Sequence, residues 1–184
     1  MRRNVQVVLL CEDAQSASFA RRFLEEQGWS KRQLRVVPFA VGGSGEQFVR
    51  EQYPVELDAY RSNSCRVGQA LVVMTDGDKL GLAARMKALE DECAARRINP
   101  RAKDERVAVI VPTWNIETWF AYLDGENVDE HRKDYPRLAR ERDCRRHVVE
   151  LCKMCREAHL RDPAPPSLAM ACEEYKTRLA VAAR

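Results

Sequence analysis

The sequence predicts an α/β fold: a mostly parallel sheet of four or more strands, helices on both faces, and further helices at the C-terminus. Short runs of β-branched and aliphatic residues alternate with helical patterns over residues 4–125, as in chains built from strand–helix–strand units. These runs are apolar at nearly every position, which is typical of parallel strands covered on both faces. The alternation stops after residue 125, and only helical patterns follow.

The first predicted strand covers residues 4–11. Asp13 is placed to cap the helix that follows, and Gly28 is placed to end it. Residues 34–41 predict a second strand, although Pro38 within it indicates an edge position or an early end.

A glycine-rich turn at residues 42–45 then opens a helix. We expect Pro54 to break or restart this helix, and we expect it to fade by Asn63. A third strand follows at residues 69–75, and a helix at residues 80–97.

A fourth strand is predicted at residues 107–111, and a short amphipathic helix at residues 115–123. Residues 136–160 read as one long helix or two, and Ser167 is placed to cap a final helix that runs toward Leu179.

We therefore divide the chain into an α/β domain at residues 4–125 and a C-terminal helical extension or subdomain at residues 126–184. A length of 184 residues fits one domain with such an appendage. The chain has no apolar run long enough to span a membrane and no signal-peptide pattern, so we expect a cytoplasmic protein. In that compartment the seven cysteines are expected to be reduced core residues.

The net charge of +3 is a small difference between 31 basic and 28 acidic residues, and it does not by itself imply a nucleic-acid partner. Arginine is nevertheless concentrated in the C-terminal third. Two interpretations are open: a solvated helix with ion pairs four residues apart, or a face that binds phosphates. Arg145 and Arg146 are the candidates for contact with nucleic acid.

The most informative pattern is that two apolar runs stop at carboxylates. Residues 4–11 lead into Glu12 and Asp13, and residues 69–75 lead into Asp76 and Asp78. Ligands of open α/β sheets bind at the carboxyl ends of the strands, so these acids are candidates for one site. Clustered carboxylates repel each other, and Mg²⁺ or Mn²⁺ would relieve the conflict. The alternative is that they are ordinary turn and capping residues.

A strand ending in Glu, a glycine-rich turn and a strand ending in Asp-x-Asp resemble the Toprim fold of topoisomerases, primases and OLD-type nucleases. The resemblance covers roughly residues 4–125. It places Glu12 on the family's invariant acid and Asp76 and Asp78 on its acid pair. It implies that these residues bind magnesium and support cleavage or transfer at phosphodiesters. The family usually has Gly after its Glu, whereas Asp13 follows here, which indicates either an extra carboxylate or a degenerate site.

Residues 112–120 are similar to a Phe/Ile-Glu-x-Trp segment of small bacterial Toprim proteins of the OLD and RloB groups. These are associated with anti-phage defence, often beside an ATPase partner. The resemblance makes Glu117 a further metal-binding or supporting acid, although an acid in a first helical turn also suits the helix dipole. We expect Trp114 and Trp119 to be core anchors rather than platforms for stacked bases.

Three further residues are candidates for contact with phosphate. Gly43 and Ser44 could cradle a phosphate at a helix start, although a plain flexible turn explains them as well. Lys79 follows Asp78 directly and is either a phosphate contact or a surface residue.

The C-terminal part also contains a Cys-x-x-His and a Cys-x-x-Cys pattern four residues apart. The candidate zinc ligands are Cys144, His147, Cys152 and Cys155. A continuous helix would aim neighbouring ligand pairs poorly at one tetrahedral centre, so reduced structural cysteines are the favoured interpretation.

Together these observations predict a metal-dependent nuclease that acts on DNA or RNA, including tRNA, as an effector in bacterial anti-phage defence and as part of an oligomer or complex. One alternative is a non-catalytic Toprim-like scaffold or regulatory subunit. Another is a receiver-like signalling domain with Asp76 as phosphoacceptor, for which the spacing from Glu12 to Asp76 is too long.

Overall fold

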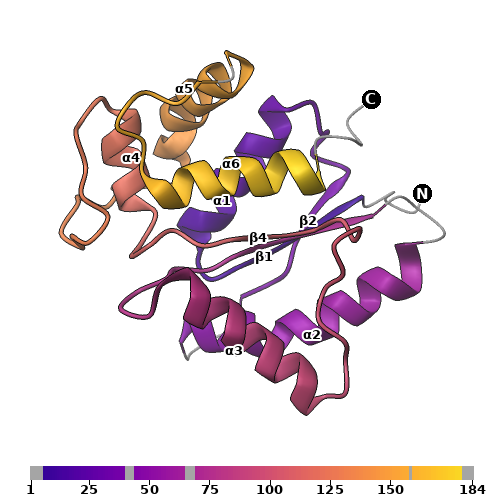
Figure 1. Cartoon of the computed structure of the whole chain (residues 1–184). Helices are drawn as coiled ribbons and strands as arrows, with labels where there is room; N and C mark the ends of the chain where they lie inside the picture. The colour runs from indigo at the N-terminus through magenta and orange to yellow at the C-terminus, as the bar shows by residue number, and fades with distance from the viewer. Residues whose placement is uncertain (1–5, 40–43, 65–68, 158, 180–184) are drawn as a thin grey trace.

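A four-stranded parallel sheet lies at the centre of the molecule, which confirms the predicted α/β class (Figure 1). The computed structural model describes residues 6–39, 44–64, 69–157 and 159–179. The strand order is β2-β1-β3-β4, and all three neighbouring pairs run parallel. The strands are β1 (Val7–Cys11), β2 (Leu34–Val36), β3 (Ala70–Met74) and β4 (Val107–Ile110).

The order in which the chain adds strands to the sheet reverses between β1 and β3. From β1 the chain moves to β2 on one side, and it then crosses back to β3 on the other side of β1, where Cys11 lies opposite Met74. A topological switch point of this kind leaves a crevice at the carboxyl ends of the two strands.

The edge strand β2 is shorter than the predicted strand at residues 34–41. It ends at Val36, two residues before Pro38, as the proline indicated. Residues 40 and 41 lie outside the described part of the chain.

Helices cover both faces of the sheet (Figure 1). On one side α1 (Ala14–Glu26) packs with α5 (Arg145–Arg156), and α6 (Pro166–Arg178) packs on β4. On the other side lie α2 (Gly45–Ser64) and α3 (Gly81–Ala95). The short helix α4 (Glu117–Leu123) follows β4 and lies toward the carboxyl ends of the strands.

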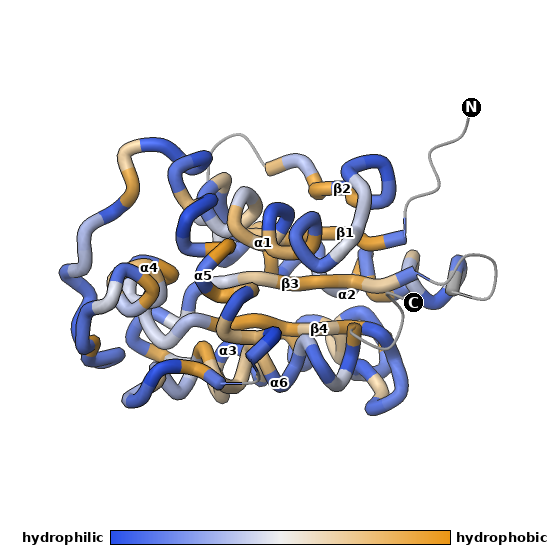
Figure 2. The backbone as a smooth tube through the Cα atoms, turned by 90° about the horizontal axis from the view of Figure 1, so that it is seen from above, coloured by the Kyte–Doolittle hydropathy of each residue, from blue (hydrophilic) through white to orange (hydrophobic). Residues whose placement is uncertain are grey.

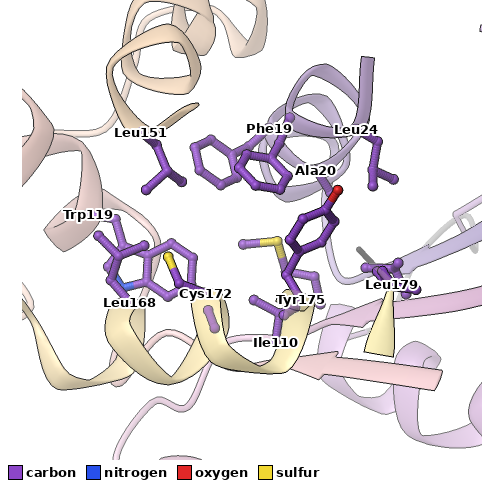
Figure 3. A pocket seen from close by; sticks show the side chains of 14 residues that line it. Phe19, Ala20, Leu24, Ile110, Trp119, Leu151, Leu168, Cys172, Tyr175 and Leu179 are labelled. Carbon is purple, nitrogen blue, oxygen red and sulfur yellow. The ribbon is translucent and has the colours of Figure 1, made fainter. Parts of the chain in front are cut away.

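Alternation along the strands explains why two apolar clusters form. In β1, Val7, Leu9 and Cys11 face the cluster that contains α1, α4, α5 and α6, whereas Val8 and Leu10 face the cluster of α2 and α3. The three longer strands therefore run as apolar bands through the interior (Figure 2). The C-terminal helices complete the first cluster, which also contains an apolar cavity of about 60 Å³ beneath α6 (Figure 3).

The prediction that Pro54 breaks a helix is wrong, because α2 is continuous through it. The proline removes one backbone donor, but its neighbours Tyr53 and Leu57 are buried in the second cluster. Their packing holds the helix together across the lost hydrogen bond.

The C-terminal third also departs from its prediction. Residues 136–140 are not helical, and a short 3₁₀ helix (Glu141–Cys144) leads into α5 instead. Ser167 does not cap the last helix, because Pro165 takes the capping position and Pro166 begins α6, where proline is favoured. Within the described ranges, no helix is both long and apolar enough to cross a bilayer.

Candidate functional site

Glu12 and Asp76 lie side by side at the switch point. Glu12 extends the ladder by donating its backbone N–H to the Met74 carbonyl at 3.0 Å. Its Oε2 then accepts hydrogen bonds from the Thr75 hydroxyl at 2.7 Å and from the Asp76 backbone N–H at 2.9 Å. The predicted meeting of the acids that follow β1 and β3 is therefore present for this pair.

The Asp76 carboxylate is held in an unfavourable environment. Its Oδ1 atom is buried and has no hydrogen-bond partner among the described residues. The pKa of Asp76 is raised to about 8, first by burial and then by the negative charges of Glu12, Asp13, Glu117 and Asp78. An isolated buried carboxylate of this kind is costly unless a proton or a cation compensates it.

Gly77 separates the two aspartates for a steric reason. Its N–H donates to the Pro112 carbonyl at 2.9 Å, and the Asp78 N–H donates to the Trp114 carbonyl at 3.2 Å. A Cβ atom at position 77 would lie only 2.3 Å from the Thr113 carbonyl oxygen. The loop after β3 is thus fixed against the loop after β4, which determines where Asp76 points.

The amino end of α2 approaches the same site. A Cβ atom at Gly45 would lie 2.5 Å from the Glu12 carbonyl oxygen and 2.5 Å from its Cγ, so only glycine fits there. Ser44 accepts a bond from the Gln47 N–H at 3.5 Å, which is the role of a capping residue. Gly43 lies outside the described residues.

Asp78 points to an arginine. Its Oδ2 lies 2.5 Å from a guanidinium nitrogen of Arg85, which also contacts Glu46 at 3.0 Å and donates to the Asp76 carbonyl at 2.8 Å. Asp78 has a positive φ of 48°, and its side chain is 54% exposed. Lys79 is also exposed. Asp78 would have to leave Arg85 to join Glu12 at a cation.

Asp13 and Glu117 are bridged by Arg137. Asp13 caps α1 through the Ser16 N–H at 2.8 Å, and its other oxygen lies 2.7 Å from Arg137. Glu117 is buried, accepts from Gln15 at 2.8 Å, and lies 3.7 Å from Arg137. Asp13 therefore adds a carboxylate beside the site, and the exposed Arg137 neutralises it in part.

The carboxylate oxygens of the site are suitable ligands for a cation, but their present positions do not form a complete metal site. No three His, Cys, Asp or Glu side chains in the described ranges are gathered closely enough to hold a metal ion. The unpaired Asp76 oxygen is nevertheless a free hard ligand surrounded by negative charge. Oxygen ligands of this kind suit Mg²⁺, which also keeps several waters.

The arginine-rich segment forms local ion pairs. Besides Arg137 with Asp13, three exposed arginines of this segment pair with aspartates: Arg132 with Asp134, Arg140 with Asp143, and Arg146 with Asp124. Arg145 is exposed at the start of α5. Only some of these charges remain available to a phosphate backbone.

The four candidate zinc ligands have different neighbours. Cys144 contacts Ser18, His147 lies 3.1 Å from Asp124, Cys152 contacts Gln27, and Cys155 lies 3.9 Å from Cys172. They therefore do not converge on one centre.

The two tryptophans after β4 differ in their surroundings. Trp119 is buried and donates its indole N–H to Ser167 at 2.8 Å, as expected of a core anchor. Trp114 is half-buried, and the Lys133 ammonium lies 6.0 Å from the centre of its ring.

Sequence reasoning missed three residues around the acids: Arg85, Arg137 and Gln15. A signal existed for Arg85, because it lies on the inward stripe of α3 with Leu82 and Leu89, where a charged residue needs a buried partner. Arg137 and Gln15 are brought to the site only by tertiary packing.

Comparison with known proteins gives no match. No protein-family model, no curated protein and no solved structure matches this chain. The likeness to the Toprim fold therefore depends on the residues themselves.

Proposed function

We propose that the protein is a magnesium-dependent nuclease of Toprim type that hydrolyses phosphodiester bonds of DNA or RNA. The observation that carries the proposal is the buried, unpaired Oδ1 of Asp76 beside Glu12 at the switch point of the sheet. This is the position where open α/β sheets bind their ligands. Because Asp76 Oδ1 has no hydrogen-bond partner among the described residues, a cation would bind there more favourably than a neutral ligand.

Each nearby residue has a role that its position supports. Asp76 and Glu12 would hold the cation, with Asp78 joining after release from Arg85, and Glu117 would support them from α4. When bound, Mg²⁺ or Mn²⁺ stabilises charge that develops at phosphorus and lowers the pKa of water. Glu12 would accept the proton of the attacking water, because its Oε1 is not used in the two bonds that fix Oε2.

Exposed cationic residues are consistent with a phosphate-rich substrate. Lys79 is exposed directly after Asp78, and Arg145 is exposed at the start of α5. Both could contact the backbone of a nucleic acid without reading its sequence. The resemblance of residues 112–120 to defence-associated Toprim proteins supports an anti-phage role beside an ATPase partner.

A non-catalytic scaffold is the second candidate, and one feature favours it. Arg85 pairs with Asp78, and Arg137 lies between Asp13 and Glu117. A site whose acids are permanently neutralised by arginines would need no metal. The protein would then contribute binding surface to a complex rather than catalysis.

A cleavage assay tests the proposal. The wild-type chain and the Asp76→Asn variant are incubated with plasmid, single-stranded DNA and tRNA in the presence of Mg²⁺ or Mn²⁺. We expect cleavage by the wild type, none without the metal, and a loss of at least about 100-fold in the variant. Asp91→Asn is the matched control, because this exposed acid pairs with Lys87 on the surface of α3.

The result separates the two candidates. Products that are equal for wild type and Asp76→Asn would refute the nuclease proposal. If no substrate is cut, the assay is repeated with an ATPase partner encoded beside the gene. Inactivity of that complex, together with no metal-dependent change in thermal stability, would favour the scaffold.

A further inference from the structure

Two cysteines on the C-terminal helices face each other. Cys155 lies in the last turn of α5 and Cys172 in the middle of α6, and their sulfur atoms are 3.9 Å apart. The other described cysteines have different neighbours: Cys11 and Cys93 are fully buried, Cys144 contacts Ser18, and Cys152 contacts Gln27.

The pair is accessible from outside. Cys155 and Cys172 are both half-buried, and both line an open hollow of about 310 Å³ between α5 and α6. His159 and Lys176 also line this hollow. Cys172 also borders the apolar cavity beneath α6, where it lies near Trp119 and Leu168 (Figure 3).

The two thiols are also chemically unequal. The contact with Cys172 lowers the pKa of Cys155 to about 7, and the positive charge of Lys176 acts in the same direction. The same contact and burial raise the pKa of Cys172. Because the thiolate is the nucleophile in thiol–disulfide exchange, Cys155 is the attacking residue and Cys172 the resolving one.

We propose that Cys155 and Cys172 form a reversible disulfide that joins α5 to α6. The sulfur atoms must approach by a little under 2 Å to reach bonding distance. The position of Cys155 one residue before the end of α5 makes that movement local.

The reaction balances with a small disulfide such as glutathione disulfide as oxidant. The Cys155 thiolate attacks one sulfur of glutathione disulfide, which forms a mixed disulfide and releases a glutathione thiolate. The Cys172 sulfur, after loss of its proton, then attacks the Cys155 sulfur and releases the second glutathione. The two protein thiols lose two electrons, and the oxidant becomes two glutathione thiols.

Peptide mapping of the folded full-length chain tests the proposal. After treatment with glutathione disulfide and trapping of free thiols, trypsin separates the relevant cysteines cleanly. Cys155 falls in residues 154–156, Cys172 in residues 162–176, and Cys152 in residues 147–153. We expect the first two peptides to be linked in most molecules, and dithiothreitol to release them.

The single variants give a signature that chance oxidation would not produce. In Cys172→Ser, Cys155 should retain one glutathione, because no resolving thiol is present. In Cys155→Ser, Cys172 should remain a free thiol. Three results would each overturn the proposal. Cys155 and Cys172 could stay reduced in the treated wild type, Cys155 could be linked to Cys152, or wild-type Cys155 could keep a stable glutathione.

A thermal melt provides a second readout. The disulfide closes a loop between residues 155 and 172 of the unfolded chain, so the oxidised protein should melt at a higher temperature than the reduced one. A lower melting temperature on oxidation would show that the native fold does not accept the bond. Neither experiment depends on nuclease activity, so this inference and the proposed function can fail separately.

Discussion

Replacing Asp76 by Asn should change how the stability of the protein depends on pH. The folded chain raises the pKa of Asp76 from an ordinary value of 3.8 to about 8, mainly because the carboxyl group is buried. Between these two values the folded state keeps a proton that the unfolded state has lost. The free energy of unfolding therefore falls as the pH rises through this window, and the effect levels off above it.

The magnitude follows from the difference between the two pKa values. That difference of about four units corresponds to about 1.4 kcal/mol for each unit, or about 6 kcal/mol at most, fully developed above about pH 8. Asparagine has the shape of the protonated acid and does not titrate. The variant should thus match the wild type near about pH 4 and exceed its stability by several kcal/mol near about pH 8.

Urea denaturation of both proteins across this pH range measures the effect. The informative quantity is the difference in unfolding free energy between variant and wild type, since the other titrating groups cancel in it. Asp91→Asn serves as the control, because that exposed acid should give a difference that is nearly constant with pH. If the difference in unfolding free energy between Asp76→Asn and wild type is also constant with pH, the claim that the Asp76 carboxylate is buried and uncompensated is refuted.

Three further changes test the surroundings of the site. Gly77→Ala should cost about 3 kcal/mol in urea unfolding, because the new Cβ meets the Thr113 carbonyl oxygen at 2.3 Å; an unchanged midpoint would contradict the close approach. Arg137→Gln should lower the Mg²⁺ concentration for half-saturation up to about fivefold, whereas Arg132→Gln, another exposed arginine with an aspartate partner, should not. Leu168→Ala should destabilise the chain by about 3 kcal/mol, because it enlarges the cavity under α6; a loss below about 1 kcal/mol would show that α6 packs loosely there.

The order of the sheet elements was predictable from the sequence because buried parallel strands leave a strong local signal. Each of the four apolar runs became a strand, and Pro38 marked the early end of β2. The same logic placed Glu12 and Asp76 at one edge, since parallel neighbours end together. These inferences needed only periodicity and the geometry of parallel sheets.

The errors arose where tertiary contacts outweighed local preference. Pro54 stays inside α2 because the buried residues on either side of it hold the helix. Ser167, expected as a cap, instead accepts a bond from Trp119. The stripe of α3 indicates that Arg85 needs a partner, but the choice of Asp78 as that partner and the position of Arg137 depend on how α3 and residues 126–140 pack.

The central claim is that the buried oxygen of Asp76 and the carboxylate of Glu12 bind one divalent cation. A crystal soaked in Mn²⁺ tests it most directly through the anomalous signal of the metal. The account predicts a manganese peak within coordination distance of Asp76 Oδ1 and Glu12, which disappears in Asp76→Asn crystals. Absence of a peak at the switch point in wild-type crystals, or a peak that survives the substitution, would contradict it.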